Sequence, residues 1–285
     1  MRIDLHTHSA VSDGTESPGD LMRAAAAAGL DAVALTDHDT TAGWDEASEA
    51  VGSTGVTLVR GAEISTRAGS ISVHLLSYLH DPTDAVLTDI LERSRASREA
   101  RAQTMVERIA ADLELTWDDV LAQAGDGATI GRPHIADALV NRGYVADRSA
   151  AFETVLHPAG PYYVRYWAAE TADAVAAVRA AGGVPVMAHP RASMRGRVVS
   201  VDTIRGLAEA GLAGLEVDHL DHTEADRAAL REIAAELGLL VTGSSDYHGA
   251  GKPNRLGERT TAREVLDEIE RQGRLPLLRP ATEQA

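Results

Sequence analysis

The chain has 285 residues with 27 basic and 43 acidic side chains, which gives a formal charge of −16 at pH 7. It contains 11 histidines and no cysteine, which excludes disulfide scaffolds, zinc ribbons, iron–sulfur clusters and thiol nucleophiles. The surplus of acidic residues argues against a broad basic surface for nucleic acid, although a local basic pocket remains compatible with it. The sequence has no run of about 18 apolar residues and no apolar signal core near its first residue, so we expect a cytoplasmic protein without a membrane span.

Short β-type runs recur along the chain, and most are separated by helical stretches. We predict strands at residues 1–5, 31–36, 57–61, 71–76, 183–188, 214–217 and 239–243. Helices are predicted at residues 18–28, after an N-cap at Ser17, and at 43–51 and 262–272. The third and fourth strands are close enough in sequence to form a hairpin. The alternation is typical of a parallel sheet covered by helices and favours an α/β barrel, with a doubly wound open sheet as the alternative.

The middle of the sequence has a different character. It is mostly helical, charged and rich in arginine, without a convincing strand. We therefore expect a barrel built from residues 1–83 and 161–285, and a helical insertion at residues 84–160 that caps the substrate site. The arginines of this insertion interleave with acids, which predicts a solvated helix face; they are Arg93, Arg95, Arg98, Arg101 and Arg108.

Side chains that bind metals follow or lie within nearly every predicted strand. His6 and His8 are two residues apart, so they share one face of the first strand. The other candidates are Asp13, His38, Glu63, His74, His189, Asp246 and His248. α/β barrels assemble active sites at the carboxyl ends of their strands. A single strand histidine is usually a core residue, but burial of this whole set without a cation would be very costly, so the pattern predicts a metal site.

The type and number of ligands restrict the metal. Imidazole and carboxylate without sulfur suit Mn²⁺, Fe²⁺ or Zn²⁺. Nine ligands are too many for one ion. Two or three ions that share a bridging carboxylate are therefore expected.

With these motifs the chain resembles the PHP (polymerase and histidinol phosphatase) family of metal-dependent phosphoesterases. The motifs are DLHTHS (4–9), TDHDT (36–40), GAE (61–63), the histidine of SVHLLSY (72–78), AHP (188–190) and SDYH (245–248). The resemblance implies an α/β fold, a distorted (β/α)7 barrel with a mostly helical inserted subdomain. It also implies three divalent ions, with Mn²⁺ preferred and Fe²⁺ or Zn²⁺ as alternatives.

The resemblance further implies how the ligands are shared among the ions. His6, His8, Glu63 and Asp246 would hold the first ion. Glu63 would bridge to a second ion, which His74 and His189 complete. Asp13, His38 and His248 would hold the third.

Among its members, the chain is most similar to small stand-alone 3′,5′-nucleotide bisphosphate phosphatases, some of which are also 5′→3′ exoribonucleases on short RNA. The segments that carry this finer similarity are 131–140, 162–165 and 181–190. The implied reaction removes the 3′-phosphate of a 3′,5′-bisphosphonucleotide through a hydroxide between the first two ions. The implied partner is a small phosphorylated nucleotide or a short RNA end. Histidinol phosphate phosphatase and a non-catalytic metal-binding module are the alternatives.

Candidates for the remaining catalytic and binding roles come from residues outside the ligand set. Asp37 and His219 are candidates for the acid that protonates the leaving group, and Asp37 is equally a candidate to orient a ligand histidine. Because arginine contacts phosphate through two donors, the candidates for substrate binding are Arg132, His134, Arg165 and Arg191. The alternative for Arg132 is a plain helix start. Three histidines outside the motifs are predicted to be surface or loop residues: His80, His157 and His222.

Overall fold

The structure is a computed structural model that describes residues 1–125 and 127–281. Seven strands form one barrel-like sheet in the order β1-β2-β3-β4-β6-β7-β8. They are β1 (Ile3–Thr7), β2 (Ala32–Leu35), β3 (Thr57–Ala68), β4 (Ile71–Tyr78), β6 (Val184–Met187), β7 (Gly214–Asp218) and β8 (Leu240–Gly243). All seven were predicted. A further two-residue strand, β5 (Ala169–Glu170), pairs with β3 and was not.

The sheet turns back on itself. A parallel bridge joins Thr7 at the end of β1 to Tyr247, just beyond β8, and the His8 N–H donates to the Tyr247 carbonyl at 2.8 Å. This contact nearly closes the barrel. The predicted α/β barrel is therefore confirmed, and the doubly wound open sheet is excluded.

The strand directions differ from the parallel arrangement that the sequence suggested. β3 and β4 form the expected antiparallel hairpin, joined by Gly69 and Ser70, with Gly69 at φ 60°. β4 also pairs antiparallel with β6, whereas the other long pairs are parallel. A two-residue turn reverses the chain without a crossover helix, so β4 must run against its neighbours.

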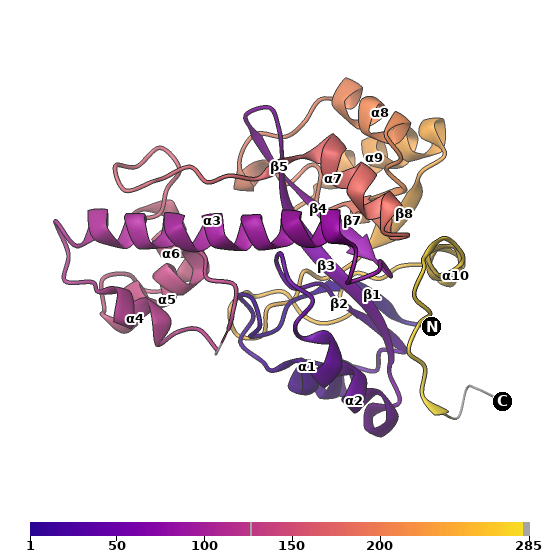
Figure 1. The fold of residues 1–285 in the computed structure, drawn as a ribbon, viewed down its shortest axis with the longest axis horizontal. Coiled ribbons are helices and arrows are strands. Elements are labelled where there is room, and N and C mark those ends of the chain that lie inside the picture. Colours follow the sequence, from indigo (N-terminus) through magenta and orange to yellow (C-terminus); the bar gives the residue numbers. More distant parts are fainter. Residues whose placement is uncertain (126, 282–285) are drawn as a thin grey trace.

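Helices cover the outside of this sheet (Figure 1). They are α1 (Pro18–Ala27), α2 (Trp44–Thr54), α7 (Thr171–Ala180), α8 (Val201–Glu209), α9 (Glu224–Leu237) and α10 (Arg263–Gln272). As expected, Ser17 caps α1: its side chain accepts from the Asp20 N–H at 3.2 Å. A short 3-10 helix, Ser193–Arg195, follows β6.

Residues between β4 and β5 form four helices, α3 (Ala85–Ile109), α4 (Trp117–Leu121), α5 (Arg132–Asn141) and α6 (Arg148–Glu153). α3 extends from the barrel to α4–α6, which gather around its far end (Figure 1). Leu87, Ile90 and Leu91 at its start pack into a barrel core. Met105 and Ile109 near its end pack into a separate core with α4, α5 and α6. One helix therefore belongs to both cores.

None of the helices in the described part of the chain is both long enough and apolar enough to cross a membrane.

Candidate metal centre at the barrel mouth

The nine predicted ligands lie close together, and Glu63 of β3 is at their centre. Its Oε1 lies 2.8 Å from His74 Nδ1 and 3.1 Å from His189 Nε2. Its Oε2 lies 3.1–3.3 Å from one ring nitrogen each of His6, His8 and His38. One buried carboxylate thus faces five imidazoles from four strands and their following loops. This is the arrangement that a bridging ligand needs.

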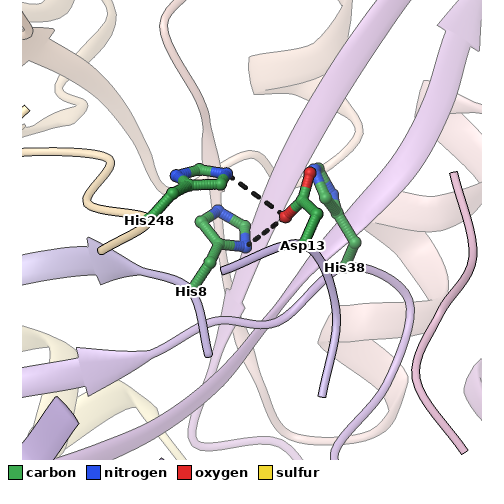
Figure 2. Close-up of side chains that lie close together, drawn as sticks. All are labelled: His8, Asp13, His38 and His248. Atoms are coloured by element: carbon green, nitrogen blue, oxygen red, sulfur yellow. Dashed lines mark ion pairs between the residues drawn. The ribbon is translucent and has the colours of Figure 1, made fainter. Parts of the chain in front are cut away.

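Asp13 anchors a second group beside the first. Figure 2 shows this aspartate with His8, His38 and His248 around it. Its Oδ1 is 3.2 Å from His248 Nε2 and 3.7 Å from His8 Nδ1, and its Oδ2 is 3.7 Å from His38 Nε2. His8 and His38 face Glu63 with one ring nitrogen and Asp13 with the other. The two groups are therefore contiguous.

Asp246 completes the set on the β8 side. Its Oδ1 lies 3.5 Å from the Nε2 atoms of both His6 and His8. Its Oδ2 accepts from Arg195 Nη2 at 2.6 Å and from Lys252 Nζ at 2.9 Å. One oxygen thus faces the histidines while two cations hold the other.

The backbone is strained at this site. Among the described residues other than glycine, Asp39, His189 and Asp246 are three of the four with positive φ, at 54°, 29° and 54°. Such conformations cost about 1–3 kcal/mol each and persist where the surroundings impose them. Two of the three are predicted ligands, and the third adjoins His38.

The charge states of the ligands depend strongly on one another. Burial alone would raise the pKa of Glu63, but His38 and His74 outweigh it and hold that pKa well below its usual range. Burial would raise the pKa of Asp13 as well, but His248 and His38 outweigh burial and hold that pKa well below its usual range. Burial lowers the pKa of His248 to about 4. Burial would lower the pKa of His8, but its hydrogen bonds to Asp246 and Glu63 outweigh burial and raise that pKa to about 9. The site therefore presents ionised carboxylates beside histidines whose charge states differ, and metal binding must displace the proton of His8.

The donor set fits divalent metal ions. Three groups of donor atoms lie within 4.8 Å of one another: His8, Asp13, His38 and His248; His6, His8 and Glu63; and His38, Glu63 and His74. His38 Nδ1 and His248 Nε2 are buried without a hydrogen-bond partner. Buried imidazole nitrogens without a hydrogen-bond partner are what a bound cation would satisfy.

Glu216 of β7 supports the centre, and the sequence analysis missed it. Its Oε1 lies 3.0 Å from His6 Nδ1, and its Oε2 accepts from the His189 N–H at 2.7 Å. Ser244 also donates to it. A carboxylate on the far nitrogen of a ligand histidine fixes the ring and its tautomer. The available signal was an acid between Leu215 and Val217 in an otherwise apolar strand.

Asp37 holds a loop rather than facing the ligands directly. Its Oδ1 accepts from the Ser9 N–H at 2.8 Å and from Ser12 Oγ at 2.6 Å, and its Oδ2 accepts from Ser9 Oγ at 2.6 Å. Ser12 Oγ in turn lies 3.4 Å from His8 Nδ1. This geometry favours the orienting role for Asp37 over that of an acid.

His219 lies at the site with one nitrogen unengaged. Its Nδ1 accepts from the Asp221 N–H at 3.0 Å, so the neutral ring carries its proton on Nε2. That Nε2 is buried without a hydrogen-bond partner and lies 3.5 Å from Asp246 Oδ2. His219 therefore presents a free donor to the centre.

The four candidate substrate residues are not equivalent. Arg132 stacks on Phe152 and Tyr163, with Cζ 5.1 and 5.8 Å from the ring centroids. The His134 Nδ1 accepts from the Gly131 N–H at 3.1 Å. Both residues lie in the first turn of α5.

Arg165 and Arg191 are less engaged. The Arg165 side chain is exposed. Arg191 is half-buried, and its N–H donates to His222 Nε2 at 3.1 Å. Neither side chain has an ion pair among the described residues, so nothing in the protein holds them away from a ligand.

Among the residues predicted to lie on the surface or in loops, His80 and His222 are in loops, as that prediction allows, but they are not on the surface. His80 and His222 are 0% and 3% exposed, because His80 packs on Trp44 and His222 Nδ1 lies 2.8 Å from the Val217 carbonyl. His157 is exposed as predicted. Arg98 and Arg101 are only 5% and 6% exposed, so the prediction of a solvated helix face is wrong at these two positions.

Comparison with known proteins agrees with this geometry. The family model of the PHP domain matches residues 4–118. A 3′,5′-nucleoside bisphosphate phosphatase from Chromobacterium violaceum is 34% identical over 98% of this chain and 99% of its own length. The chain belongs to the PHP family. It is accordingly a phosphoesterase, a hydrolase of the metal-dependent class.

Other PHP relatives differ in the reaction they are named for. A 5′-3′ exoribonuclease from Haemophilus influenzae is 34% identical over 87% of this chain and 90% of its own. A phosphoribosyl 1,2-cyclic phosphate 1,2-diphosphodiesterase from Eggerthella lenta is 33% identical over 92% and 100%. A solved structure from Bifidobacterium adolescentis, assigned to the metal-dependent phosphoesterases, is 44% identical with a TM-score of 0.93, over 95% and 96% of the two chains. Phosphoester hydrolysis is common to these names, while the substrate varies.

Proposed function

We propose that this protein removes the 3′-phosphate of 3′,5′-bisphosphonucleotides in the cytoplasm. The observation that carries the proposal is the complete Glu63-centred ligand set in a chain similar over its whole length to a bisphosphate phosphatase. Three divalent ions, Mn²⁺ in first place, are assigned to the nine predicted ligands. When bound, such ions activate water and offset the charge of the phosphate.

The residues of the chain have separate tasks in this proposal. Glu216 and Asp37 hold the ligand histidines and the first loop in place. His219 Nε2 donates a hydrogen bond to the leaving oxygen and stabilises the negative charge that develops there, because this is its free hydrogen-bonding atom, and water supplies the proton. Residues 84–160 act as the substrate cap and contribute Arg132 and His134. Arg165 and Arg191 are the further phosphate contacts.

The test is phosphate release from adenosine 3′,5′-bisphosphate by Mn²⁺-loaded protein, with histidinol phosphate as the comparison substrate. We expect a kcat/KM at least about tenfold higher for the bisphosphate. Faster release from histidinol phosphate would make that compound the substrate in place of the bisphosphate. No release from any phosphoester would overturn the proposal that the protein is a phosphatase. His219→Asn should lower kcat by about 10²- to 10³-fold with little change in bound metal, the usual cost of removing one hydrogen-bond donor to a developing negative charge.

A second activity is supported by the exoribonuclease relative, which the chain matches over 87% of its length. We propose that short RNA with a 5′-phosphate is shortened from that end at the same centre. A 3′-labelled RNA of a few nucleotides, followed by gel electrophoresis, should lose nucleotides one at a time from its 5′ end. An RNA that stays intact under conditions where the bisphosphate is hydrolysed would restrict the function to nucleotides.

A further inference from the structure

The inserted helices also contact the barrel away from α3. The place is the loop between β1 and α1, residues 8–17, which carries Asp13 and which we call the Asp13 loop. The Thr129 N–H donates to the Val11 carbonyl of this loop at 2.9 Å. Arg148, the first residue of α6, donates from Nη1 to the Asp13 carbonyl at 3.1 Å. The insertion is therefore bonded to the backbone of a predicted metal ligand.

Arg148 is anchored within the insertion by a second residue. Its Nε and Nη2 donate to the Oδ1 and Oδ2 atoms of Asp137, on α5, at 2.6 and 2.5 Å. The Arg148 side chain is only 13% exposed. A bidentate pair of this kind fixes the plane of the guanidinium. Because the pair occupies Nε and Nη2, the remaining nitrogen, Nη1, is held in a fixed position toward the Asp13 loop.

The same guanidinium packs against the segment that follows β8. A Cβ on Gly251 would lie 2.7 Å from Arg148 Cζ, so the guanidinium lies against the backbone of this glycine. The Gly251 N–H donates to the His248 carbonyl at 3.2 Å. The Ala250 N–H donates to Thr15 Oγ1 of the Asp13 loop at 2.8 Å. Arg148 therefore lies where the Asp13 loop and the turn that begins at His248 meet.

These two segments supply two ligands of a single donor group. Asp13 Oδ1 lies 3.2 Å from His248 Nε2, and both atoms belong to the group that His8 and His38 complete. On the barrel side, Asp37 holds the Asp13 loop through Ser9 and Ser12. Arg148 holds the same loop from the side of the insertion. Residues that fix the backbone of a ligand keep its donor atom in place, and their loss weakens metal binding.

We propose that Arg148 is a positioning residue for the ion assigned to Asp13, His38 and His248, and that the insertion thereby takes part in metal binding. The inference rests on the proposed function, which assigns three ions to the nine ligands. Arg148 contacts none of the predicted donor atoms. It acts through the Asp13 backbone and through its packing on Gly251, so that the two segments are held at the spacing that the ion requires.

The first experiment measures metal binding without turnover. Metal-depleted wild type, Arg148→Met, Asp137→Asn and the control Arg142→Met are titrated calorimetrically with Mn²⁺. Arg142 is a matched control because it also forms a bidentate pair within the insertion, with Asp119 Oδ1 and Oδ2 at 2.7 and 2.8 Å. In Arg148→Met we expect the affinity for one ion to fall about 10- to 100-fold, while the other ions stay within about twofold. Asp137→Asn should change the same ion in the same direction, and Arg142→Met should bind as wild type does.

A double-mutant cycle separates positioning from a general loss of structure. If Arg148 acts through Asp13, the variant that combines Arg148→Met with Asp13→Asn should bind the affected ion about as weakly as Asp13→Asn alone, because interacting residues are not additive. A merely structural arginine would weaken all ions, and its effect would add to that of Asp13→Asn. If Arg148→Met does not fold, Asp137→Asn, which keeps the guanidinium, decides by the same criteria.

Phosphate release from adenosine 3′,5′-bisphosphate, measured on the same samples, keeps this inference apart from the proposed function. If wild type releases no phosphate but Arg148→Met loses affinity for one ion, the proposed function fails and the role of Arg148 stands. If wild type releases phosphate and Arg148→Met binds every ion as wild type does, the inference fails and the proposed function stands. Equal weakening of all ions, or the same loss in Arg142→Met, also overturns the inference.

Discussion

At the scale of single residues, Glu216 is the clearest test of the metal centre. It holds His6 through Nδ1 and His189 through its backbone, so it orients two predicted ligands without binding metal itself. Glu216→Gln should lower metal affinity by about 10- to 100-fold, the usual effect of removing such a partner. Titration of metal-depleted protein with Mn²⁺ measures this. Glu236→Gln, which removes an exposed partner of Arg205, is the matched control and should bind metal as wild type does.

His80 gives a pH prediction that is independent of the centre. Burial lowers its pKa to about 4, against 6.5 for an ordinary histidine. Below pH 6.5 the side chain of His80 binds a proton in the unfolded chain, whereas in the folded protein it does not bind one until about pH 4. The free energy of unfolding therefore falls as the pH drops through this window, by about 3 kcal/mol in total.

Urea unfolding between pH 7 and 4, in the presence of a chelator, measures this contribution. In His80→Gln, the plot of unfolding free energy against pH should have a shallower slope. The difference should correspond to at most one fewer proton taken up on unfolding. Parallel curves for the variant and wild type would show that His80 does not titrate as its surroundings require.

At the same scale, the ligands could be predicted from the sequence, whereas the burial of Arg98 and Arg101 could not. His6, His8, Glu63 and Asp246 each follow from strand position and motif. Arg98 and Arg101 lie on a helix whose exposed residues include Glu92 and Glu99, which is the local pattern of a solvated surface. Only the packing of the segments around Arg132 and Tyr166 against α3 buries them, and that packing is not encoded in the local spacing.

At the scale of elements, a glycine tests the close packing at the end of β8, beside β7. A Cβ at Gly243, the last residue of β8, would lie 2.6 Å from the Thr260 carbonyl oxygen and 2.7 Å from Asp218 Cβ. Gly243→Ala should therefore cost about 2–3 kcal/mol, because backbone must move to make room. Gly206→Ala is the opposite control: in helix α8 its Cβ meets nothing within 4 Å, and we expect a gain of about 0.5–1 kcal/mol.

Chemical denaturation of both variants measures these values. A small effect at Gly243 would show that the backbone around Thr260 and Asp218 moves easily and that the end of β8 is packed less tightly than its contacts indicate.

The existence of the strands was predictable because each is a short apolar run between turn signals, but their direction was not. β4 is antiparallel because the Gly69–Ser70 turn leaves no room for a crossover, and the sequence marked that hairpin as an option. The two-residue β5 is too short to have a periodic pattern. It exists only because residues after the long excursion return beside the end of β3.

At the scale of the whole molecule, the metal centre joins distant parts of the chain. Its predicted ligands come from β1, β3, β4 and the segments after β1, β2, β6 and β8. Ions that bind the folded state alone stabilise it according to their affinity, by about 2.7 kcal/mol at 100 times Kd. Mn²⁺ should therefore raise the Tm of metal-depleted protein by about 5–10 °C.

Scanning calorimetry with and without a chelator tests this. In Asp13→Asn the increase should be smaller, because one group of donors loses its carboxylate. An identical increase in this variant would place the stabilising ion away from Asp13.

Helix α3 has a mechanical consequence. Its first turns pack into the barrel core and its last turns into the separate core formed with α4, α5 and α6, which lie around its far end (Figure 1). A single unbroken helix of 25 residues cannot bend at its middle without losing hydrogen bonds, so it has no natural hinge. Under the proposed function, the helix fixes the distance between the barrel mouth and helices α4–α6, so molecules would be selected by whether they span that interval.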